Sequence, residues 1–196
     1  MANYRALFLM AAWVAMAPTA PALAQEAAPT AVPVHKQTTL GKYLSARQAF
    51  ELVSKDPAKV LFVDIRTAPE LMFLGTPTAI DAHVPFAELA SPLAWDDKGN
   101  RWQMAANPAF VSQIESRLAA KGLSKSDTII LMCRSGDRTV GGVNTLAKAG
   151  FNNVYSLYEG FEGDMSPDGR RTLNGWRNAG LPWSYKLDKA KVMSSR

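Results

Sequence analysis

Apolar positions along the chain follow two patterns, continuous runs and stripes with helical spacing. Short continuous runs rich in β-branched residues cover residues 60–65, 128–132 and 154–157. Such runs, bounded by polar residues, are typical of strands buried on both faces of a sheet. Helical spacing of apolar residues predicts amphipathic helices over residues 46–54, from Asn107 to about Gly122, and over about 138–149.

Capping residues mark the ends of these helices. Ser45 can accept a backbone hydrogen bond at the start of the first helix, and Asn107 followed by Pro108 is expected to start the second. Gly122 and Gly150 are expected to end the second and third helices. Each of the three helices therefore has at least one end defined by a specific residue.

The stretch between residues 66 and 102 shows no sustained pattern. Prolines interrupt it repeatedly, so we expect it to be irregular, with short elements inside it such as a helical turn at Pro69–Leu74, and with a turn at residues 96–100. A short helix is expected around residues 173–179. Because strands alternate with helices, the pattern predicts an α/β domain with a mostly parallel sheet flanked by helices, in which ligands bind at the carboxyl ends of the strands.

The first residues carry the pattern of an export signal. Arg5 precedes an apolar run from Ala6 to Met16, and Ala22-Leu23-Ala24 fits a signal-peptide cleavage site. We therefore expect residues 1–24 to be removed, which leaves an exported chain without a membrane span, periplasmic if the host is Gram-negative. An uncleaved membrane anchor is the alternative, although the run is short for a transmembrane helix.

The rest of the chain divides into one domain and two polar ends. Residues 25–38 are rich in alanine, proline and threonine and are expected to be flexible. Residues 39–186 are expected to form a single domain, since their number suits one core. Residues 187–196 form a polar tail.

The net charge of +5 at pH 7 is mild for 196 residues. No block of lysine and arginine is present, so the sequence gives no support for nucleic-acid binding. A small anion is a more natural binding partner than a nucleic acid for a chain with this mild positive charge. No cofactor and no metal are expected, because one cysteine and the distant His35 and His83 do not form a zinc site.

Cys133 is the only cysteine and directly follows the apolar run at residues 128–132. It therefore has no partner for an internal disulfide and is either a small buried hydrophobe or a reactive thiol. A predicted helix N-terminus follows it, and arginines flank it; both stabilise a thiolate. The candidate site consists of the nucleophile Cys133 and a surrounding anion-binding loop of Arg134, Ser135, Gly136, Asp137, Arg138 and Thr139.

Around this loop, the sequence resembles the rhodanese (thiosulfate sulfurtransferase) family. The resemblance rests on the Cys133–Arg138 loop with the Ala149-Gly150-Phe151 segment after it, on Val63-Asp64-Ile65-Arg66 followed by Glu70, and on Gly175-Trp176 with Ala179-Gly180-Leu181-Pro182. It covers most of Leu40–Tyr185. It implies a rhodanese-like domain with about five strands in the sheet. Asp64 and Arg66 would support the rim of the site.

The resemblance also implies an activity. Cys133 would take a sulfane sulfur from a small sulfur-containing anion such as thiosulfate, forming a persulfide, and a thiol, cyanide or a protein cysteine would then accept that sulfur. A non-catalytic sulfur carrier or protein-interaction module is the main alternative. Phosphatase or arsenate reductase activity is a further one; dual-specificity phosphatases space their arginine as Cys-x5-Arg, whereas this chain has Cys-x4-Arg.

The chain departs from the family in two respects. Where the family has Gly-His-Ile-x-Gly-Ala, this chain has Gly75–Ile80, which contains no histidine. Residues 93–106 and 164–172 are expected to be insertions. Such loops can cover a site and select the acceptor.

Overall fold

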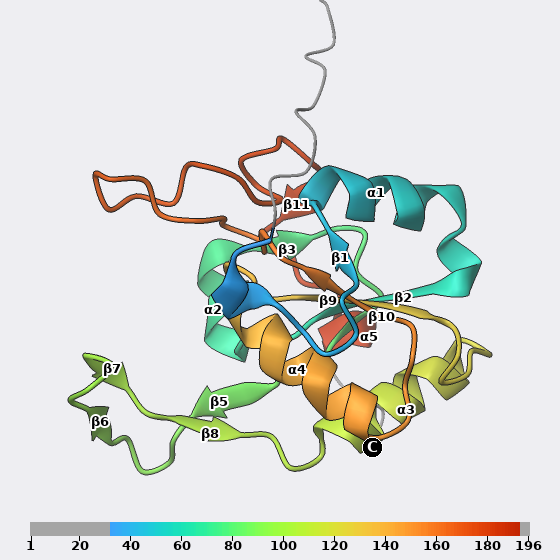
Figure 1. The fold of residues 1–196 in the computed structure, drawn as a ribbon, viewed down its shortest axis with the longest axis horizontal. Helices are drawn as coiled ribbons and strands as arrows, with labels where there is room; N and C mark the ends of the chain where they lie inside the picture. The colour runs from blue at the N-terminus through green and yellow to red at the C-terminus, as the bar shows by residue number, and fades with distance from the viewer. Residues whose placement is uncertain (1–31, 193–196) are drawn as a thin grey trace, which may run out of the picture. The chain divides into compact units, whose positions relative to one another are not determined.

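The three strands predicted from apolar runs lie together in one five-stranded sheet (Figure 1). The computed structural model describes residues 32–192, so the predicted signal peptide lies outside the described residues. The strand order is β1-β10-β9-β2-β4, and every neighbouring pair is parallel, which confirms the predicted parallel sheet. Its strands are β1 (Tyr43–Leu44), β2 (Val60–Asp64), β4 (Ala82–His83), β9 (Thr128–Met132) and β10 (Val154–Leu157).

The register of the central strands places Cys133 at the carboxyl edge of the sheet. Asp64, the last residue of β2, lies opposite Met132, the last residue of β9. The amide of Ile65 then donates to the carbonyl of Met132 at 2.8 Å, so the pairing continues just past both strands. Cys133 therefore leaves the sheet beside the chain that follows β2.

Helices cover both faces of the sheet (Figure 1). On one face, α3 (Phe110–Ala120) and α4 (Asp137–Lys148) pack against alternate side chains of β2 and β9, including Leu61 and Leu131. On the other face, α1 (Ala46–Lys55) and Trp176 pack against the intervening side chains, such as Phe62. The strands are buried on both faces because every second residue points to a different helix layer.

The helix ends follow the predicted caps with one exception. Ser45 and Gln48 form a capping box at the start of α1, as do Thr67 and Glu70 at the start of α2 (Ala68–Leu74). The expected start of α3 at Asn107 is wrong, because Asn107 instead closes a turn by accepting from the amide of Ala109, and the helix begins at Phe110.

The stretch at residues 66–102 holds short elements, as expected: α2 and several strands of two or three residues, too short to show a period. One further expectation is corrected. The helix expected around residues 173–179 is a series of turns, because Gly175 and Gly180 have φ values of 97° and 70°, which an α-helix does not use. The remaining short elements are β3 (Thr76–Pro77), β5 (Ala87–Leu89), β6 (Trp95–Asp96), β7 (Arg101–Trp102), β8 (Met104–Ala106), β11 (Trp183–Ser184) and the 3-10 turn η2 (Pro57–Lys59).

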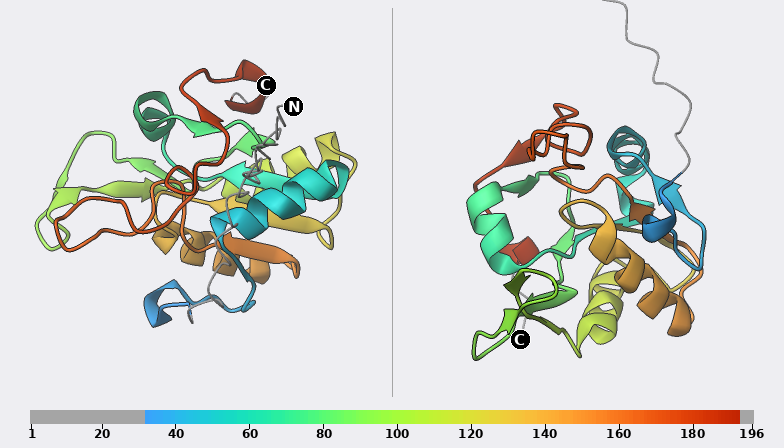
Figure 2. Two further views of the ribbon diagram at one scale, coloured as in Figure 1. Left: turned by 90° about the horizontal axis from the view of Figure 1, so that it is seen from above. Right: turned by 60° about the vertical axis from the view of Figure 1, so that its left-hand side comes forward.

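Two antiparallel pairs build a projection next to α2. Strand β5 pairs with β8, and β6 pairs with β7 further out. We call residues 87–106 the arm; Figure 2 shows it in green, projecting from the domain beside α2. The side chain of Glu88 accepts a hydrogen bond from the amide of Ala68 and so ties the arm to the start of α2.

The described part of the predicted flexible segment packs on the domain. The 3-10 turn η1 (Val34–Lys36) carries Lys36, whose side chain is 2% exposed. Its Nζ donates to the carbonyl of Tyr158 at 3.0 Å and to Asp164 Oδ1 at 2.5 Å. The ordered chain thus begins before residue 39, because this buried cation joins the segment to the loop after β10.

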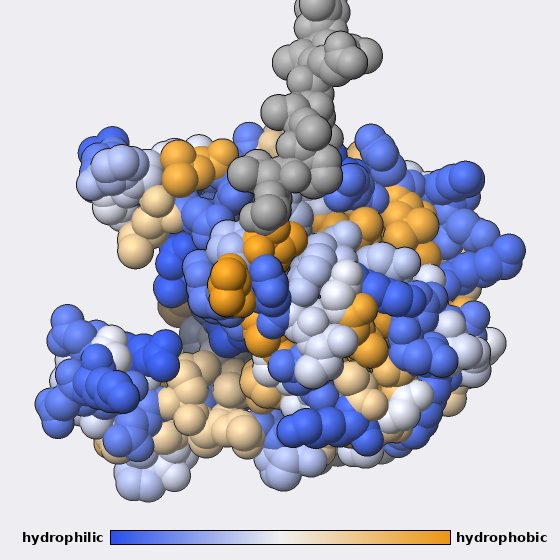
Figure 3. Space-filling model, in the orientation of Figure 1, coloured by the Kyte–Doolittle hydropathy of each residue, from blue (hydrophilic) through white to orange (hydrophobic). Residues whose placement is uncertain are grey.

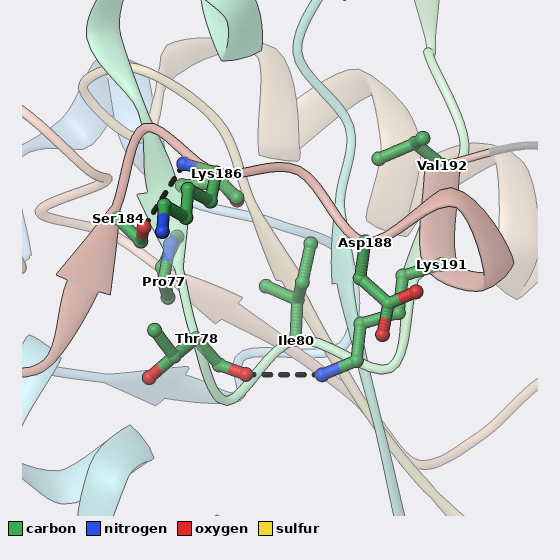
Figure 4. Close-up of a pocket in the computed structure, with 9 residues that line it drawn as sticks. Pro77, Thr78, Ile80, Ser184, Lys186, Asp188, Lys191 and Val192 are labelled. Atoms are coloured by element: carbon green, nitrogen blue, oxygen red, sulfur yellow. Dashed lines mark hydrogen bonds between the residues drawn. The ribbon is translucent and has the colours of Figure 1, made fainter.

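Part of the polar tail also packs on the domain. Helix α5 (Lys189–Val192) lies against the chain around β3, where Lys191 Nζ donates to the carbonyl of Thr78 at 3.0 Å (Figure 4). A pocket of about 210 Å³ lies between these segments. Among residues 32–192, no helix has both the length and the apolar character needed to cross a membrane.

We expect replacement of Lys36 with methionine to destabilise the domain. The substitution leaves the Asp164 carboxylate and the Tyr158 carbonyl without their cation, and Asp164 is one-third exposed, so the free energy of unfolding should fall by about 1–3 kcal/mol. Urea unfolding measures the change. Lys59→Met is the matched control, because the Lys59–Asp56 pair is exposed and should contribute at most about 1 kcal/mol. Equal stability of the two variants would contradict the structural role of Lys36.

Candidate active site

Cys133 lies at the bottom of a loop between β9 and α4. The residue is 1% exposed and its thiol is free. The amide of Gly136 donates to Cys133 Sγ at 3.2 Å, a contact that stabilises negative charge on sulfur. The start of α4 adds further backbone N–H groups on the same side. The predicted position of the cysteine, between a buried strand and a helix N-terminus, is the one observed.

The loop takes its shape from Gly136. This residue has φ of 89°, in the left-handed region, and a Cβ there would overlap the carbonyl of Tyr158. Glycine alone meets both requirements at low cost. The turn it makes directs its own amide back to the sulfur of Cys133.

A second loop, residues 158–163, supports the cysteine loop from behind. The amide of Phe161 donates to the carbonyl of Cys133 at 2.8 Å, and the amide of Glu162 donates to the carbonyl of Arg134 at 2.9 Å. Gly160 allows the close approach, because a Cβ there would overlap the backbone of Arg134. Backbone hydrogen bonds therefore fix the cysteine loop from outside its own sequence.

The polar side chains of the loop hold its conformation. Ser135 donates to Asp137 Oδ2 at 2.6 Å, and Thr139 donates to the carbonyl of Gly136 at 2.5 Å. Thr139 is fully buried and also lies 2.5 Å from the hydroxyl of Ser156 on β10. Of these residues, Thr139 and Gly136 do not line the open space in front of Cys133, whereas Ser135 and Asp137 do.

Arg138 forms a two-point ion pair with Glu70, a residue absent from the predicted site. Its Nη1 and Nη2 donate to the two carboxylate oxygens at 2.8 Å and 2.5 Å. Burial alone would raise the pKa of Glu70, but the hydrogen bonds and charge of Arg138, with bonds from Thr67, outweigh it and lower the pKa to about 2. Burial likewise disfavours the charged Arg138, yet Glu70 raises its pKa above the usual value. Both partners stay ionised at neutral pH.

Arg134 has a different environment. It is exposed, and its guanidinium has no hydrogen-bond or ion-pair partner among residues 32–192. Arg101 on the arm lies 3.5 Å from Asp96. Of the arginines that line the site in the described chain, Arg134 is therefore the one whose charge is not already matched by a carboxylate.

Asp64 and Arg66 are fully buried beneath the site and do not line it. Arg66 Nη2 donates to Asp64 Oδ2 at 2.6 Å and to the carbonyl of Gly75 at 2.8 Å. The guanidinium also lies over the Phe161 ring, 4.3 Å from its centroid. Since the amide of Phe161 supports the Cys133 carbonyl, this buried pair acts on the site through the loop behind it.

A histidine takes part in the same buried network. His83 ends β4 next to Asp64, and its Nε2 lies 2.7 Å from the carbonyl of Arg66. The sequence predicts no histidine here, because Gly75–Ile80 stands in the place of the family's histidine segment. The structure differs, since His83 comes from a later position in the chain and contacts the carbonyl of Arg66.

The open space in front of Cys133 is a cleft of about 430 Å³. Figure 3 shows the surface hollowed beside the arm, whose inner part is apolar and whose tip is hydrophilic. Residues 93–106 belong to the arm and supply three lining residues of the cleft, so they cover the site as expected. Residues 164–172, the other expected insertion, supply no lining residue. The lining residues are Thr67, Pro69, Glu70, Leu89, Arg101, Trp102, Met104, Cys133, Arg134, Ser135, Asp137 and Arg138.

The predicted site named no single residue of α2 or of the arm, although residues 93–106 were expected to cover it. The sequence does contain a signal for Thr67 and Glu70. The pattern Thr-x-x-Glu is typical of a capping box, which places a carboxylate at the start of a helix. For Trp102 and Met104 no local pattern shows that they face Cys133. Among residues 32–192, no group of three or more histidine, cysteine, aspartate or glutamate side chains is arranged to hold a metal.

Comparison with known proteins agrees with this geometry. A family model described as "Rhodanese-like domain" matches residues 45–166, more than half of the chain. An uncharacterized protein of Rickettsia rickettsii is 29% identical over 134 residues, which cover 68% of this chain and 89% of the relative. An uncharacterized protein of Rickettsia conorii is 28% identical over the same length and share of each chain.

A solved structure shares the fold. The crystal structure of Rv0390 from M. tuberculosis is 26% identical and covers 74% of this chain and 98% of that chain, with a TM-score of 0.58. The matched family and this likeness together confirm the fold class predicted from the sequence.

We expect the Glu70–Arg138 pair to make stability depend on pH in acid. The folded pKa of Glu70, about 2, lies below its ordinary value of 4.5, so its contribution is complete above pH 4.5 and is lost as the pH falls towards 2. Glu70→Gln should therefore unfold about 2–3 kcal/mol more easily at pH 7, with the difference shrinking between pH 4.5 and 2. Urea unfolding across pH tests this.

The matched control for this experiment is Glu115→Gln. The ion pair of Glu115 with Lys125 is nearly half exposed and should contribute little. A stability loss in Glu70→Gln that stays the same from pH 7 to pH 2 would contradict the assigned ion pair.

Proposed function

The chain belongs to the rhodanese-like domain family, and on that premise we propose that it is a sulfurtransferase that carries sulfane sulfur on Cys133. The observation that carries the proposal is the hydrogen bond from the Gly136 amide to Cys133 Sγ at the bottom of an open cleft. A buried cysteine with only a packing role does not need a backbone donor on its sulfur or a cleft in front of it.

The proposed reaction has two displacements, written here for thiosulfate as the donor. The Cys133 thiolate attacks the outer sulfur of thiosulfate; the sulfur–sulfur bond of the donor breaks, and sulfite leaves with its electron pair. The product is a Cys133 persulfide. A thiolate or cyanide then attacks the outer persulfide sulfur, and Cys133 leaves as the thiolate. Covalent catalysis of this kind divides one transfer into two steps.

The loop supports each charged state along this path. The amide of Gly136 donates to the Cys133 sulfur, a contact that stabilises the thiolate that attacks the donor and the thiolate that leaves after discharge. The N–H groups at the start of α4 favour the same negative charge, and the loop at residues 158–163 holds the cysteine loop beside them through hydrogen bonds to the carbonyls of Cys133 and Arg134. Arg138 contributes its fixed charge while Glu70 positions it.

We expect Cys133→Ser to abolish both steps. The parent protein, incubated with thiosulfate, should gain the mass of one sulfur and release thiocyanate when cyanide is added. The serine variant should do neither, because an alkoxide is not formed at neutral pH and a persulfide cannot form on oxygen. Intact mass and thiocyanate colour are the measurements. Circular dichroism of both proteins establishes that the variant is folded.

Two contrary outcomes are distinct in this experiment. A sulfur adduct on Cys133→Ser would overturn the assignment of the nucleophile. A folded parent with a free thiol that gains no sulfur would overturn thiosulfate as the donor.

We also infer that the protein is exported after cleavage behind Ala24. The support is the sequence alone: Arg5, the apolar run to Met16 and the small residues Ala22 and Ala24. The expected mature protein begins at Gln25, and in a Gram-negative host it is released with the periplasmic fraction. Intact mass of the protein from that fraction checks the cleavage. The full-length mass in the membrane fraction would contradict it.

A further inference from the structure

Lys36 is a buried cation that lies ahead of residues 45–166, the stretch that the family model matches. Its side chain is 2% exposed. The turn that carries it, η1, lies beside α4 and close to the cysteine loop; Figure 1 shows this turn in blue. A lysine is almost never buried so completely unless its charge is paired, so the contacts of its Nζ atom indicate what the burial serves.

The first contact of Lys36 is with backbone that touches the cysteine loop. Its Nζ donates to the carbonyl oxygen of Tyr158 at 3.0 Å. That oxygen lies directly against Gly136, because a Cβ on Gly136 would overlap it. Gly136 is the residue whose amide donates to Cys133 Sγ at 3.2 Å. Lys36 therefore holds the atom that limits how far the turn at Gly136 can move.

The second contact of Lys36 holds the lysine itself in place. Asp164 Oδ1 accepts from Nζ at 2.5 Å. Asn174 fixes Asp164 in turn, since its side chain accepts from the Asp164 amide at 2.8 Å and donates to Asp164 Oδ2 at 3.1 Å. The carboxylate is therefore a fixed acceptor that keeps Nζ beside the Tyr158 carbonyl.

The charge of Lys36 acts in the direction that a thiolate needs. A carbonyl oxygen carries partial negative charge, and the oxygen of Tyr158 lies beside the loop that holds Cys133. A cation on that oxygen offsets the partial charge, and the effect is strong where water is excluded. The other contact of η1 with this loop is weaker, because His35 Nε2 lies 3.6 Å from Asp137 Oδ1 and both side chains are exposed.

We propose that Lys36 is a positioning residue for the nucleophile: it holds the Tyr158 carbonyl against Gly136 and so keeps the Gly136 amide directed at the sulfur. Lys36 does not line the cleft, so it acts on the thiolate and not on binding of the donor. The inference rests on the proposed function, because it assigns a further residue to the same site. It extends that site to a turn outside the residues that the family model matches.

The test measures the nucleophile in two ways on reduced mature protein. Alkylation of Cys133 by iodoacetamide at pH 7, followed by intact mass, reports thiolate reactivity without a sulfur donor. Loading with thiosulfate gives the limiting rate constant and the half-saturating donor concentration. In Lys36→Met we expect both rate constants to fall about tenfold. The half-saturating concentration should stay within about twofold of the parent value, because Lys36 does not line the cleft.

A double variant separates positioning from stability. Lys36→Met leaves the partly buried Asp164 carboxylate without its cation, so this variant is less stable. Lys36→Met/Asp164→Asn also removes that charge and should recover much of the stability, but it still lacks the cation on the Tyr158 carbonyl. We expect its rate constants to be as low as those of Lys36→Met. Lys36→Arg, which keeps a cation, should regain part of the rate. Urea unfolding and circular dichroism measure the fold of each variant.

Lys121→Met is the matched control for loss of a lysine. Lys121 Nζ donates to the carbonyl of Val60 at 2.6 Å and to a carboxylate oxygen of Asp81, so its contacts are of the same kind. It lies at the beginning of β2, whereas Cys133 follows the end of the neighbouring strand β9. Because the two sites are far apart, this variant should keep both rate constants within about twofold of the parent values.

Asp164→Asn is the control for loss of the ion pair alone. The asparagine oxygen can still accept from Lys36, and Lys36 keeps its contact with the Tyr158 carbonyl. We therefore expect this variant to react at about the parent rate, in contrast to the double variant.

Three outcomes would overturn the inference. The first is a folded double variant with the rate constants of the parent. The second is an equal fall in Lys121→Met or Asp164→Asn, which would assign the effect to stability or to the ion pair. The third is a double variant that does not fold, which would assign Lys36 to the stability of the whole domain. If alkylation follows the expected order but no protein, the parent included, loads sulfur, the result counts against the proposed function and supports the positioning role.

Discussion

The site depends on how closely two stretches of backbone approach each other. The cysteine loop and the loop at residues 158–163 meet with no side chain between them, because Gly136 and Gly160 lie at the points of contact. This approach allows the hydrogen bonds from Phe161 and Glu162 to the loop. It also sets the left-handed turn at Gly136 that directs an amide to the Cys133 sulfur. A side chain at either glycine would separate the loops and remove the amide from the sulfur.

Buried ion pairs hold the elements around this contact. Arg66 pairs with Asp64 below the sheet edge, Arg138 pairs with Glu70 at the side, and Lys36 pairs with Asp164 behind the second loop. The Arg138–Glu70 and Lys36–Asp164 pairs join segments that are distant in the sequence, whereas Asp64 and Arg66 lie two residues apart. Each pair is positioned by further hydrogen bonds, the condition under which a buried charge is tolerated. The charged side chains at the cleft outside these pairs are those of Arg101, Arg134 and Asp137, which lie beside the start of α4 or on the arm.

The sequence predicted the centre of this molecule better than its periphery. The runs at residues 60–65, 128–132 and 154–157 identified the central strands because burial on both faces leaves an unmistakable apolar pattern. The two-residue edge strands β1 and β4 have no period to detect. The cysteine loop was placed correctly, since a strand, a glycine and a helix start are local signals. The ion-pair partners Glu70 and Asp164 come from distant segments, so their pairing depends on the three-dimensional fold.

The arm and the cysteine loop are held by separate sets of hydrogen bonds. Substitutions in the arm can therefore change the lining of the cleft and leave the surroundings of Cys133 as they are. The strands of the arm pair with each other and not with the central sheet, and the arm contacts the catalytic side of the domain through the amide of Ala68 and the walls of the cleft. Substitutions at Trp102 or Met104 therefore change the wall of the cleft, while the hydrogen bonds to Cys133 come from Gly136 and from the loop at residues 158–163. A site divided in this way keeps its nucleophile fixed on rigid elements and carries its selectivity on an appended loop. Under the proposed function, a change of acceptor would therefore be expected to follow from changes in the arm, whose strand pairing and lining positions depend on the three-dimensional fold.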